Sequence, residues 1–188
     1  MNGDAIKRVT NALKARLEKF DGQGSVHVGP LDDPNANAAS LILFLYRIIP
    51  SPTLRNHEHR VLSADPPATT IVYRNSFPLD LYFLITVGRR PADEASLLET
   101  LGKAILDLHV DPQIVGADVA HETVHISFEP LTTDEASRIW QLFPTAVYRT
   151  SVSYLLTPVW IDPPIPLQGP RVLQDSLREG SKVAPIDV

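Results

Sequence analysis

The chain has 188 residues, of which 44% are hydrophobic and 21% charged, a balance typical of one globular domain with a core of its own. The net charge of -5 argues against sequence-independent binding of nucleic acid, and the lack of cysteine excludes disulfides, thiol nucleophiles and cysteine-ligated zinc. We expect a soluble chain made in the cytoplasm, because its start lacks the apolar core of a signal peptide and no apolar run reaches the ~20 residues of a membrane span.

The first predicted element is an amphipathic helix over residues 4–20, with Asp4 as its cap. Its apolar stripe consists of Ile6, Val9, Leu13, Leu17 and Phe20. The stretch has five basic and two acidic residues, so it is locally positive. A membrane-surface helix and a nucleic-acid-binding helix of an assembly factor both remain open, but packing on a sheet with outward-reaching basic side chains is favoured.

Two strands follow in the first third of the chain. A short strand is expected around Val26 and Val28, and a longer one at Leu41–Ile49. Alternation puts Leu41, Leu43, Leu45, Arg47 and Ile49 on one face of the longer strand and the other residues on the opposite face. Because both faces are apolar, we expect a central strand that is covered on both sides.

The remaining elements alternate between strands and helices. The predicted order is a short strand within residues 68–74, a strand at Leu79–Val87, a helix at Asp93–His109, a strand at Glu122–Phe128, a helix within residues 131–143 and a strand at Arg149–Trp160. Asp93 and either Thr132 or Thr133 are placed to cap the two helices. In the strand at Glu122–Phe128, the inward residues are Val124, Ile126 and Phe128.

These elements predict a single α+β domain over residues 1–162, with a central mixed, largely antiparallel sheet packed by about three helices. Residues 163–188 read as an extended, Pro-rich C-terminal arm. Apolar residues are spaced along this arm at Ile165, Leu167, Val172, Leu173 and Leu177. Such a segment is suited to lie on a partner surface.

The candidate chemical groups follow the strand at Leu41–Ile49, where a polar loop runs from Arg55 to Arg60. His57 and His59 are two apart, which suits zinc only on a strand, and no third ligand is evident. His121 and His125 fall at a predicted strand, where their side chains need not converge. We therefore expect a solvated loop and no metal, cofactor or catalytic residue. Arg89 and Arg90 form a possible anion clamp.

Six sequence blocks, taken in order, resemble the cap, or tail-terminator, proteins of extracellular contractile injection systems, the phage-tail-like particles that include the antifeeding prophage and Photorhabdus virulence cassettes. The blocks are LILFLYRIIPSPTLRN, FPLDLYFLITVG, LLETLGKAILDLHVDPQI, VHISFEPLTTDEASRIWQLF and YRTSVSYLLTPVWID, after the N-terminal helix. The typical motifs of the family are read here as Leu45-Tyr46-Arg47, Leu54-Arg55-Asn56 and the segment Leu79–Thr86. The resemblance covers residues 4–162 and does not extend to the arm.

The resemblance implies a structural protein rather than an enzyme. Its members look like subunits of a homo-hexameric ring that closes the baseplate-distal end of the inner tube and sheath, stops polymerisation and anchors the last sheath layer. It implies partners among tube and sheath proteins, no nucleic acid and no membrane, in a particle that is released from the cell. The expected contact residues are Arg55, Asn56, Arg60, Arg89, Arg90, Ile165, Leu167, Val172, Leu173 and Leu177. The alternative is a small metal- or ligand-binding domain or enzyme that uses the His57–Arg60 loop.

Overall fold

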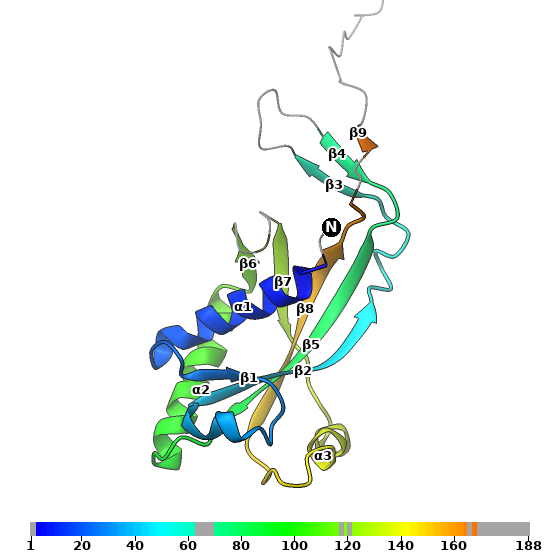
Figure 1. Ribbon diagram of the computed structural model, residues 1–188. Helices are drawn as coiled ribbons and strands as arrows, with labels where there is room; N and C mark the ends of the chain where they lie inside the picture. The colour runs from blue at the N-terminus through cyan, green and yellow to red at the C-terminus, as the bar shows by residue number, and fades with distance from the viewer. Residues whose placement is uncertain (1–2, 63–69, 117–118, 120–121, 165–166, 169–188) are drawn as a thin grey trace, which may run out of the picture.

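The computed structural model describes residues 3–62, 70–116, 119, 122–164 and 167–168, and it contains two sheets (Figure 1). The six-stranded sheet has the order β1 (Val26–Val28), β2 (Leu41–Pro50), β5 (Phe77–Val87), β8 (Ser151–Ile161), β7 (Thr123–Phe128), β6 (Gln113–Val115). Its strands pair antiparallel except for β1 and β2, which are parallel. The predicted α+β class with a mixed, largely antiparallel sheet is therefore confirmed.

The second sheet has three strands and stands beyond one end of the long strands β5 and β8 (Figure 1). It consists of β3 (His59–Leu62), β4 (Thr70–Tyr73) and β9 (Leu167–Gln168), with β4 in the middle. Both of its pairings are antiparallel. The first part of the predicted arm thus returns to a sheet of its own chain, where Leu167 is opposite Val72.

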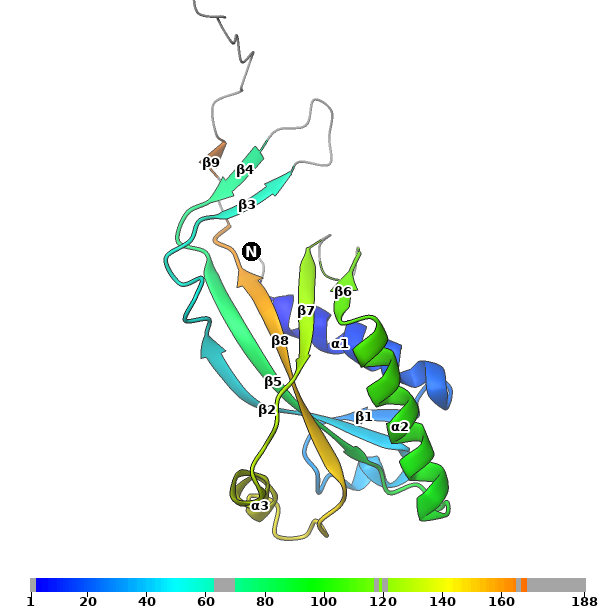
Figure 2. The same ribbon diagram turned by 180° about the vertical axis from the view of Figure 1, so that it is seen from behind.

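Helices cover both faces of the six-stranded sheet, which curls around them (Figure 2). On one face, α1 (Ala5–Leu17) and α2 (Glu94–Val110) pack on a cluster that includes the fully buried Leu13, Phe83 and Leu156. On the other face, α3 (Thr133–Gln141) and the short helix η2 (Pro34–Ala38) share a smaller core with β2 and β5. A further short helix, η1 (Glu18–Phe20), follows α1. None of the helices in the described part of the chain could span a membrane.

Side-chain caps explain where two of the helices begin. Asp93 accepts a hydrogen bond from the backbone N–H of Ser96 at the start of α2, as expected. Thr132 and Glu135 form a reciprocal capping box at the start of α3, which identifies Thr132 as the cap. Asp4 does not cap α1, because its carboxylate accepts instead from Arg8 one turn later, at 2.7 Å.

The basic side of α1 contributes to packing through Arg16, which is buried between α1, α2 and β6. Its guanidinium binds the Asp107 carboxylate and donates to the backbone oxygens of Asp107 and Gln113, at 2.7 and 2.9 Å. A guanidinium has five donors in a fixed fork, so one side chain satisfies the end of α2 and the start of β6 together. The expected packing of this helix on the sheet is confirmed.

The expectation that β2 is covered on both faces is wrong for its second half. Leu41, Ile42 and Leu43 are buried, but Ile48 is 43% exposed. The pairing with β5 shifts by one residue between Leu45 and Arg47. This bulge turns Arg47 away from the face of Leu45, and its guanidinium carbon lies 5.1 Å from the centre of the Tyr82 ring.

The last strand correction concerns β7. Val124 and Ile126 are buried as predicted, whereas Phe128 is exposed at the end of the strand.

Candidate functional site at the junction of the two sheets

Three buried polar residues, His59, Ser76 and Asp162, meet where the small sheet joins the large one. His59 is the first residue of β3, and Asp162 directly follows β8. The Nδ1 atom of His59 lies 2.8 Å from Oδ1 of Asp162, and the same oxygen accepts a hydrogen bond from the Ser76 hydroxyl at 2.8 Å. Because Asp162 accepts from both sides, Nδ1 of His59 is the protonated nitrogen that donates to it.

Two aromatic rings hold the imidazole of His59 in position. It stacks on Trp160 of β8 with the ring centres 4.5 Å apart and the planes 7° from parallel. On the small sheet, the Tyr73 ring lies 6.0 Å from it. The ring plane is therefore fixed, and the opposite nitrogen, Nε2, points to one defined place.

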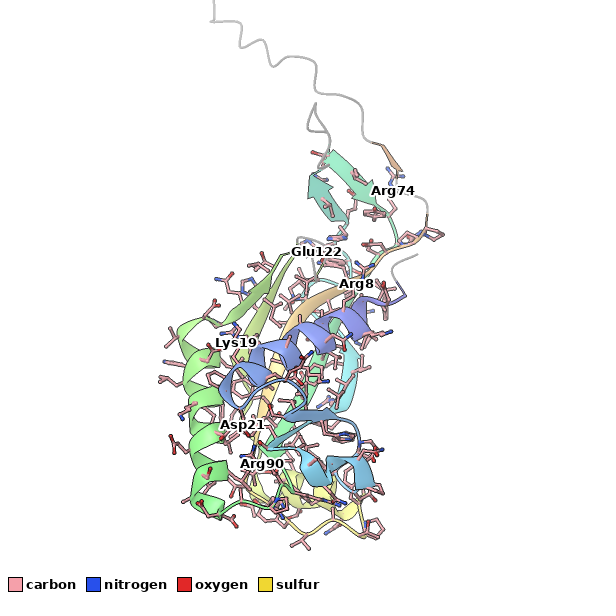
Figure 3. The ribbon with its side chains drawn as sticks, turned by 60° about the vertical axis from the view of Figure 1, so that its left-hand side comes forward. Arg8, Lys19, Asp21, Arg74, Arg90 and Glu122 are labelled. Carbon is pink, nitrogen blue, oxygen red and sulfur yellow. The ribbon has the colours of Figure 1, made fainter. Side chains whose placement is uncertain are left out.

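Glu122 occupies that place. Its carboxylate oxygen Oε1 lies 3.6 Å from Nε2 of His59, and its side chain is only 15% exposed. The pKa of Glu122 is raised to about 7, chiefly because burial disfavours the charged carboxylate; His59 lowers this pKa and the charge of Asp162 raises it. Figure 3 shows Glu122 at the level where the small sheet begins.

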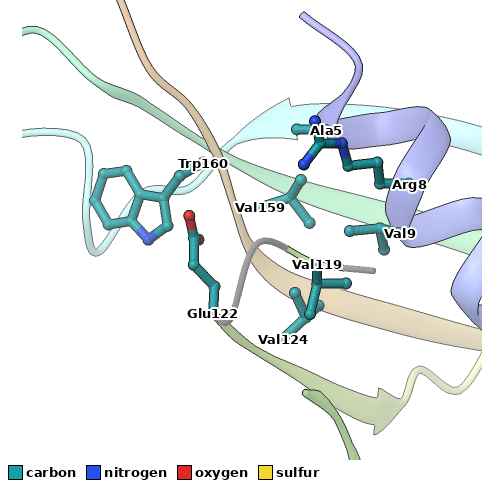
Figure 4. Close-up of a pocket in the computed structure, with 8 residues that line it drawn as sticks. All are labelled: Ala5, Arg8, Val9, Val119, Glu122, Val124, Val159 and Trp160. Carbon is teal, nitrogen blue, oxygen red and sulfur yellow. The ribbon is translucent and has the colours of Figure 1, made fainter. Parts of the chain in front are cut away.

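A small pocket opens beside Glu122, at the start of α1. Arg8 and Ala5 of α1 line it together with Val119, Glu122 and Trp160, and further apolar residues complete it. In Figure 4 the carboxylate of Glu122 is turned toward Trp160, and valine side chains lie between it and α1. The pocket walls are mostly apolar, so they keep water away from the carboxylate and account for its raised pKa.

His59, Glu122 and Asp162, here called the junction cluster, offer three ligand atoms within 4.8 Å of one another. Nδ1 of His59 and Oδ1 of Asp162 are hydrogen-bonded to each other at 2.8 Å, which is closer than two ligands of a tetrahedral zinc whose bonds are about 2 Å long. Nε2 then faces a single carboxylate. The imidazole thus lies between two carboxyl groups, hydrogen-bonded to Asp162 at 2.8 Å and in a longer ion-pair contact with Glu122 at 3.6 Å.

The prediction of a fully solvated loop from Arg55 to Arg60 is thus wrong at His59, which is 6% exposed. His57 is exposed as predicted. The two histidines differ in exposure because β3 begins at His59 and turns the side chain of His59 inward. His125 is also exposed, and His121 lies outside the described residues. No motif or spacing indicated that Glu122 and Asp162 would meet His59.

The predicted contact residues have three different surroundings. Arg55, Asn56 and Arg60 are exposed, and Arg60 pairs with Glu58 on the surface at 3.2 Å. Arg89 and Arg90 have partners within the chain. Arg89 donates a hydrogen bond to the backbone oxygen of Leu31. Arg90 forms an ion pair with Asp21 at 2.7 Å, and both residues are labelled in Figure 3. Leu167 lies in β9. The other arm residues, Ile165, Val172, Leu173 and Leu177, lie outside the described part of the chain.

Apolar side chains that the sequence assigned to no site are exposed on two surfaces. One surface includes a groove beside α3 that Phe128 and Tyr148 line, together with Leu142 and Val147 in and after the end of that helix; each of the four is at least half exposed. The other lies on the outer side of α2 and the edge strand β6. It is formed by Leu98, Leu106, Val110 and Val115. Large apolar side chains that remain exposed on neighbouring elements are candidates for contact with other proteins.

Two solved structures are similar to this chain in fold. The structure matches the sheath/tube terminator in the extended state of an extracellular contractile injection system, PVC, with a TM-score of 0.57 and 17% identity over 95% of this chain. It also matches the anti-feeding prophage cap, the AFP tube terminating cap, with a TM-score of 0.57 and 21% identity over 90% of this chain. The chain spans 65% and 60% of those two proteins.

A search of curated proteins finds no match to the sequence. The family model described as the Pvc16 N-terminal domain matches residues 8–175, which includes the start of the arm as well as the domain that carries the resemblance. At these identities the two solved structures establish the fold, and the family model covers most of the sequence. The chain belongs to the Pvc16 N-terminal domain family.

Proposed function

We propose that this chain is a structural cap that closes the baseplate-distal end of the inner tube and sheath of a contractile injection particle. The observation that carries the proposal is that both matched structures are terminators, and each match covers at least 90% of this chain. As a cap, it stops polymerisation and anchors the last sheath layer. Its work is done by surfaces and not by a catalytic centre.

The exposed surfaces support this role. The groove beside α3 and the outer side of α2 together present eight large apolar residues to solvent. Their burial against neighbouring subunits would contribute to assembly in proportion to the apolar area covered. We assign the chain to a homo-hexameric ring with tube and sheath proteins as partners, in a particle that acts outside the cell.

The test of the cap role is deletion of the chain from the producing cell. Tubes and sheaths are then expected to have uncontrolled lengths, or the particles to be unstable, because nothing ends the polymer. Electron microscopy of purified particles measures both lengths, and re-expression of the chain is the control. Particles of normal length and full sheath occupancy in the deletion strain would show that the chain is not the terminator.

Exposed polar residues of β3 and of the loop before it are the proposed contacts on the projecting side of the molecule. Arg55→Ala combined with Arg60→Ala is expected to weaken assembly of rings or capped ends, because a guanidinium makes bidentate contacts that alanine cannot replace. The midpoint of thermal unfolding should hardly change, since the ion pair between Arg60 and Glu58 is exposed and such pairs contribute about 0–1 kcal/mol.

His57→Ala is the matched control for that double variant, because His57 lies in the same loop and is also exposed. His59 is unsuitable as a control, because it is buried in the junction cluster. Negative-stain counts of capped particle ends measure the effect. Equal capping by the double variant and by His57→Ala would remove Arg55 and Arg60 from the interface.

A further inference from the structure

The two sheets are joined by side chains at the junction cluster and not by a shared strand ladder. In the described residues, no strand of the small sheet pairs with a strand of the large one. The cluster instead ties together β3 through His59, the end of β8 through Asp162 and the start of β7 through Glu122. A three-stranded sheet with one two-residue strand is marginal by itself, so this anchorage matters for its order.

An attractive contact between His59 and Glu122 requires one proton that the two groups share. Asp162 accepts from Nδ1 of His59 and from Ser76, which leaves only Nε2 facing Glu122 at 3.6 Å. With a proton on either of these two groups, their contact is attractive. Without it, the lone pair of Nε2 faces a carboxylate, and two buried anions share a single neutral imidazole.

We propose that this proton operates a clamp: while it is bound, Glu122 holds His59 and the β3–β4 hairpin is fixed on the six-stranded sheet, and its loss frees the hairpin. The described titratable or charged groups around Glu122 are Arg8 from α1, His59 from β3, Tyr73 from β4 beyond His59, and Asp162 after β8. Arg8 is engaged by Asp4 at 2.7 Å, which leaves Glu122 without a close guanidinium partner among these residues.

The direction of the pH effect follows from the raised pKa of Glu122. Between its ordinary value of 4.5 and about 7, the folded chain keeps a proton that the unfolded chain has released. The contribution of Glu122 to stability is therefore greatest below this window and is lost as the pH rises through it. The clamp therefore weakens as the pH rises through this window and is open above about pH 7.

Glu122→Gln separates the proton from the rest of the cluster. The glutamine amide has a permanent N–H donor for Nε2 and cannot ionise, so it imitates the protonated acid at every pH. Glu58→Gln is the matched control: Glu58 precedes His59 but is exposed and pairs with Arg60 and Arg74 on the surface. The two changes are chemically identical, but only Glu122→Gln removes a titratable carboxyl group from the junction cluster.

Hydrogen exchange of the β3 and β4 amides in the full 188-residue chain, divided by the intrinsic exchange rate at each pH, tests the clamp. We expect protection of the wild type and of Glu58→Gln to fall as the pH rises from 4.5 to about 7, by up to about tenfold per pH unit, as for release of one proton, and to level off at higher pH. In Glu122→Gln, protection should stay high and independent of pH. Amides of β5 serve as the internal reference.

Two results would overturn the proposal. Equal pH dependence of hairpin protection in the wild type and Glu122→Gln would place the titration elsewhere. The second concerns metal and is tested at pH 8 with EDTA and with added zinc. If one equivalent of zinc restored at pH 8 the hairpin protection that the wild type shows at acidic pH, the cluster would be a metal site instead. Protection that neither EDTA nor zinc changes agrees with the clamp. Trp160 emission in a Trp140→Phe background gives a second readout, because Trp160 stacks on His59.

Discussion

Phe83→Ala is expected to lower the free energy of unfolding by about 3–5 kcal/mol, enough to remove a large part of the stability of a domain of this size. Phe83 is fully buried in β5, a central strand of the large sheet. Its neighbours in the ladder are Leu45 of β2 and Tyr154 of β8. Removing the ring leaves a cavity between strands that are themselves held on both sides, so the site cannot collapse to fill it.

The matched control is Phe77→Ala at the start of the same strand. Phe77 is 49% exposed and lies where β5 leaves the core, so its loss should cost less than about 1 kcal/mol. Urea unfolding followed by circular dichroism measures both variants under one condition. If the two variants were equally stable, the core would not be centred on β5 as the structure has it.

Regular elements with a strong hydrophobic period were predictable from the sequence. The helix α2 has a periodic apolar stripe and a capping aspartate, and it forms within a residue of the expected bounds. In the same way, the order of β2, β5, β7 and β8 along the chain follows from their apolar runs. These features depend on residues near one another in sequence, which is why one sequence is enough to find them.

Features that depend on contacts between distant segments were not predictable. The bulge at Tyr46 changes the face on which Arg47 lies, and nothing in the alternation announces an extra residue. The strand β3 is four residues long and β9 is two, too short for a hydrophobic period to show. Both pair with β4, which follows β3 closely in the sequence but is far from β9.

The residues of the candidate site could not be predicted from the sequence for the same reason. His59, Glu122 and Asp162 come from three separate segments, so no motif spacing links them. The burial of His59 between two carboxylates arises only when β3 docks on the end of β8. The partner of Arg89 is a backbone oxygen, which every residue carries. The sequence therefore contains no residue type that would predict this contact.

Removal of the residues after Gly169 is expected to abolish binding to particle ends while leaving the fold intact. These residues carry Val172, Leu173 and Leu177, spaced apolar side chains that lack enough neighbours in sequence to form a core. Such a segment gains order by laying its apolar residues on a partner, and we propose a neighbouring subunit or the terminal sheath layer as that partner.

Truncation after Pro164 is the comparison that separates the two parts of the arm, because it also removes β9 from the small sheet. We expect this shorter chain to lose both end binding and the order of the β3–β4 hairpin, since β4 then has β3 as its only ladder partner among the described strands. Co-sedimentation with uncapped particles measures binding, and hydrogen exchange measures the hairpin. A chain ending at Gly169 that still caps particles would show that the distal arm is dispensable. If that chain instead unfolded at a lower temperature as an isolated monomer, the distal arm would belong to its own domain and not to a partner.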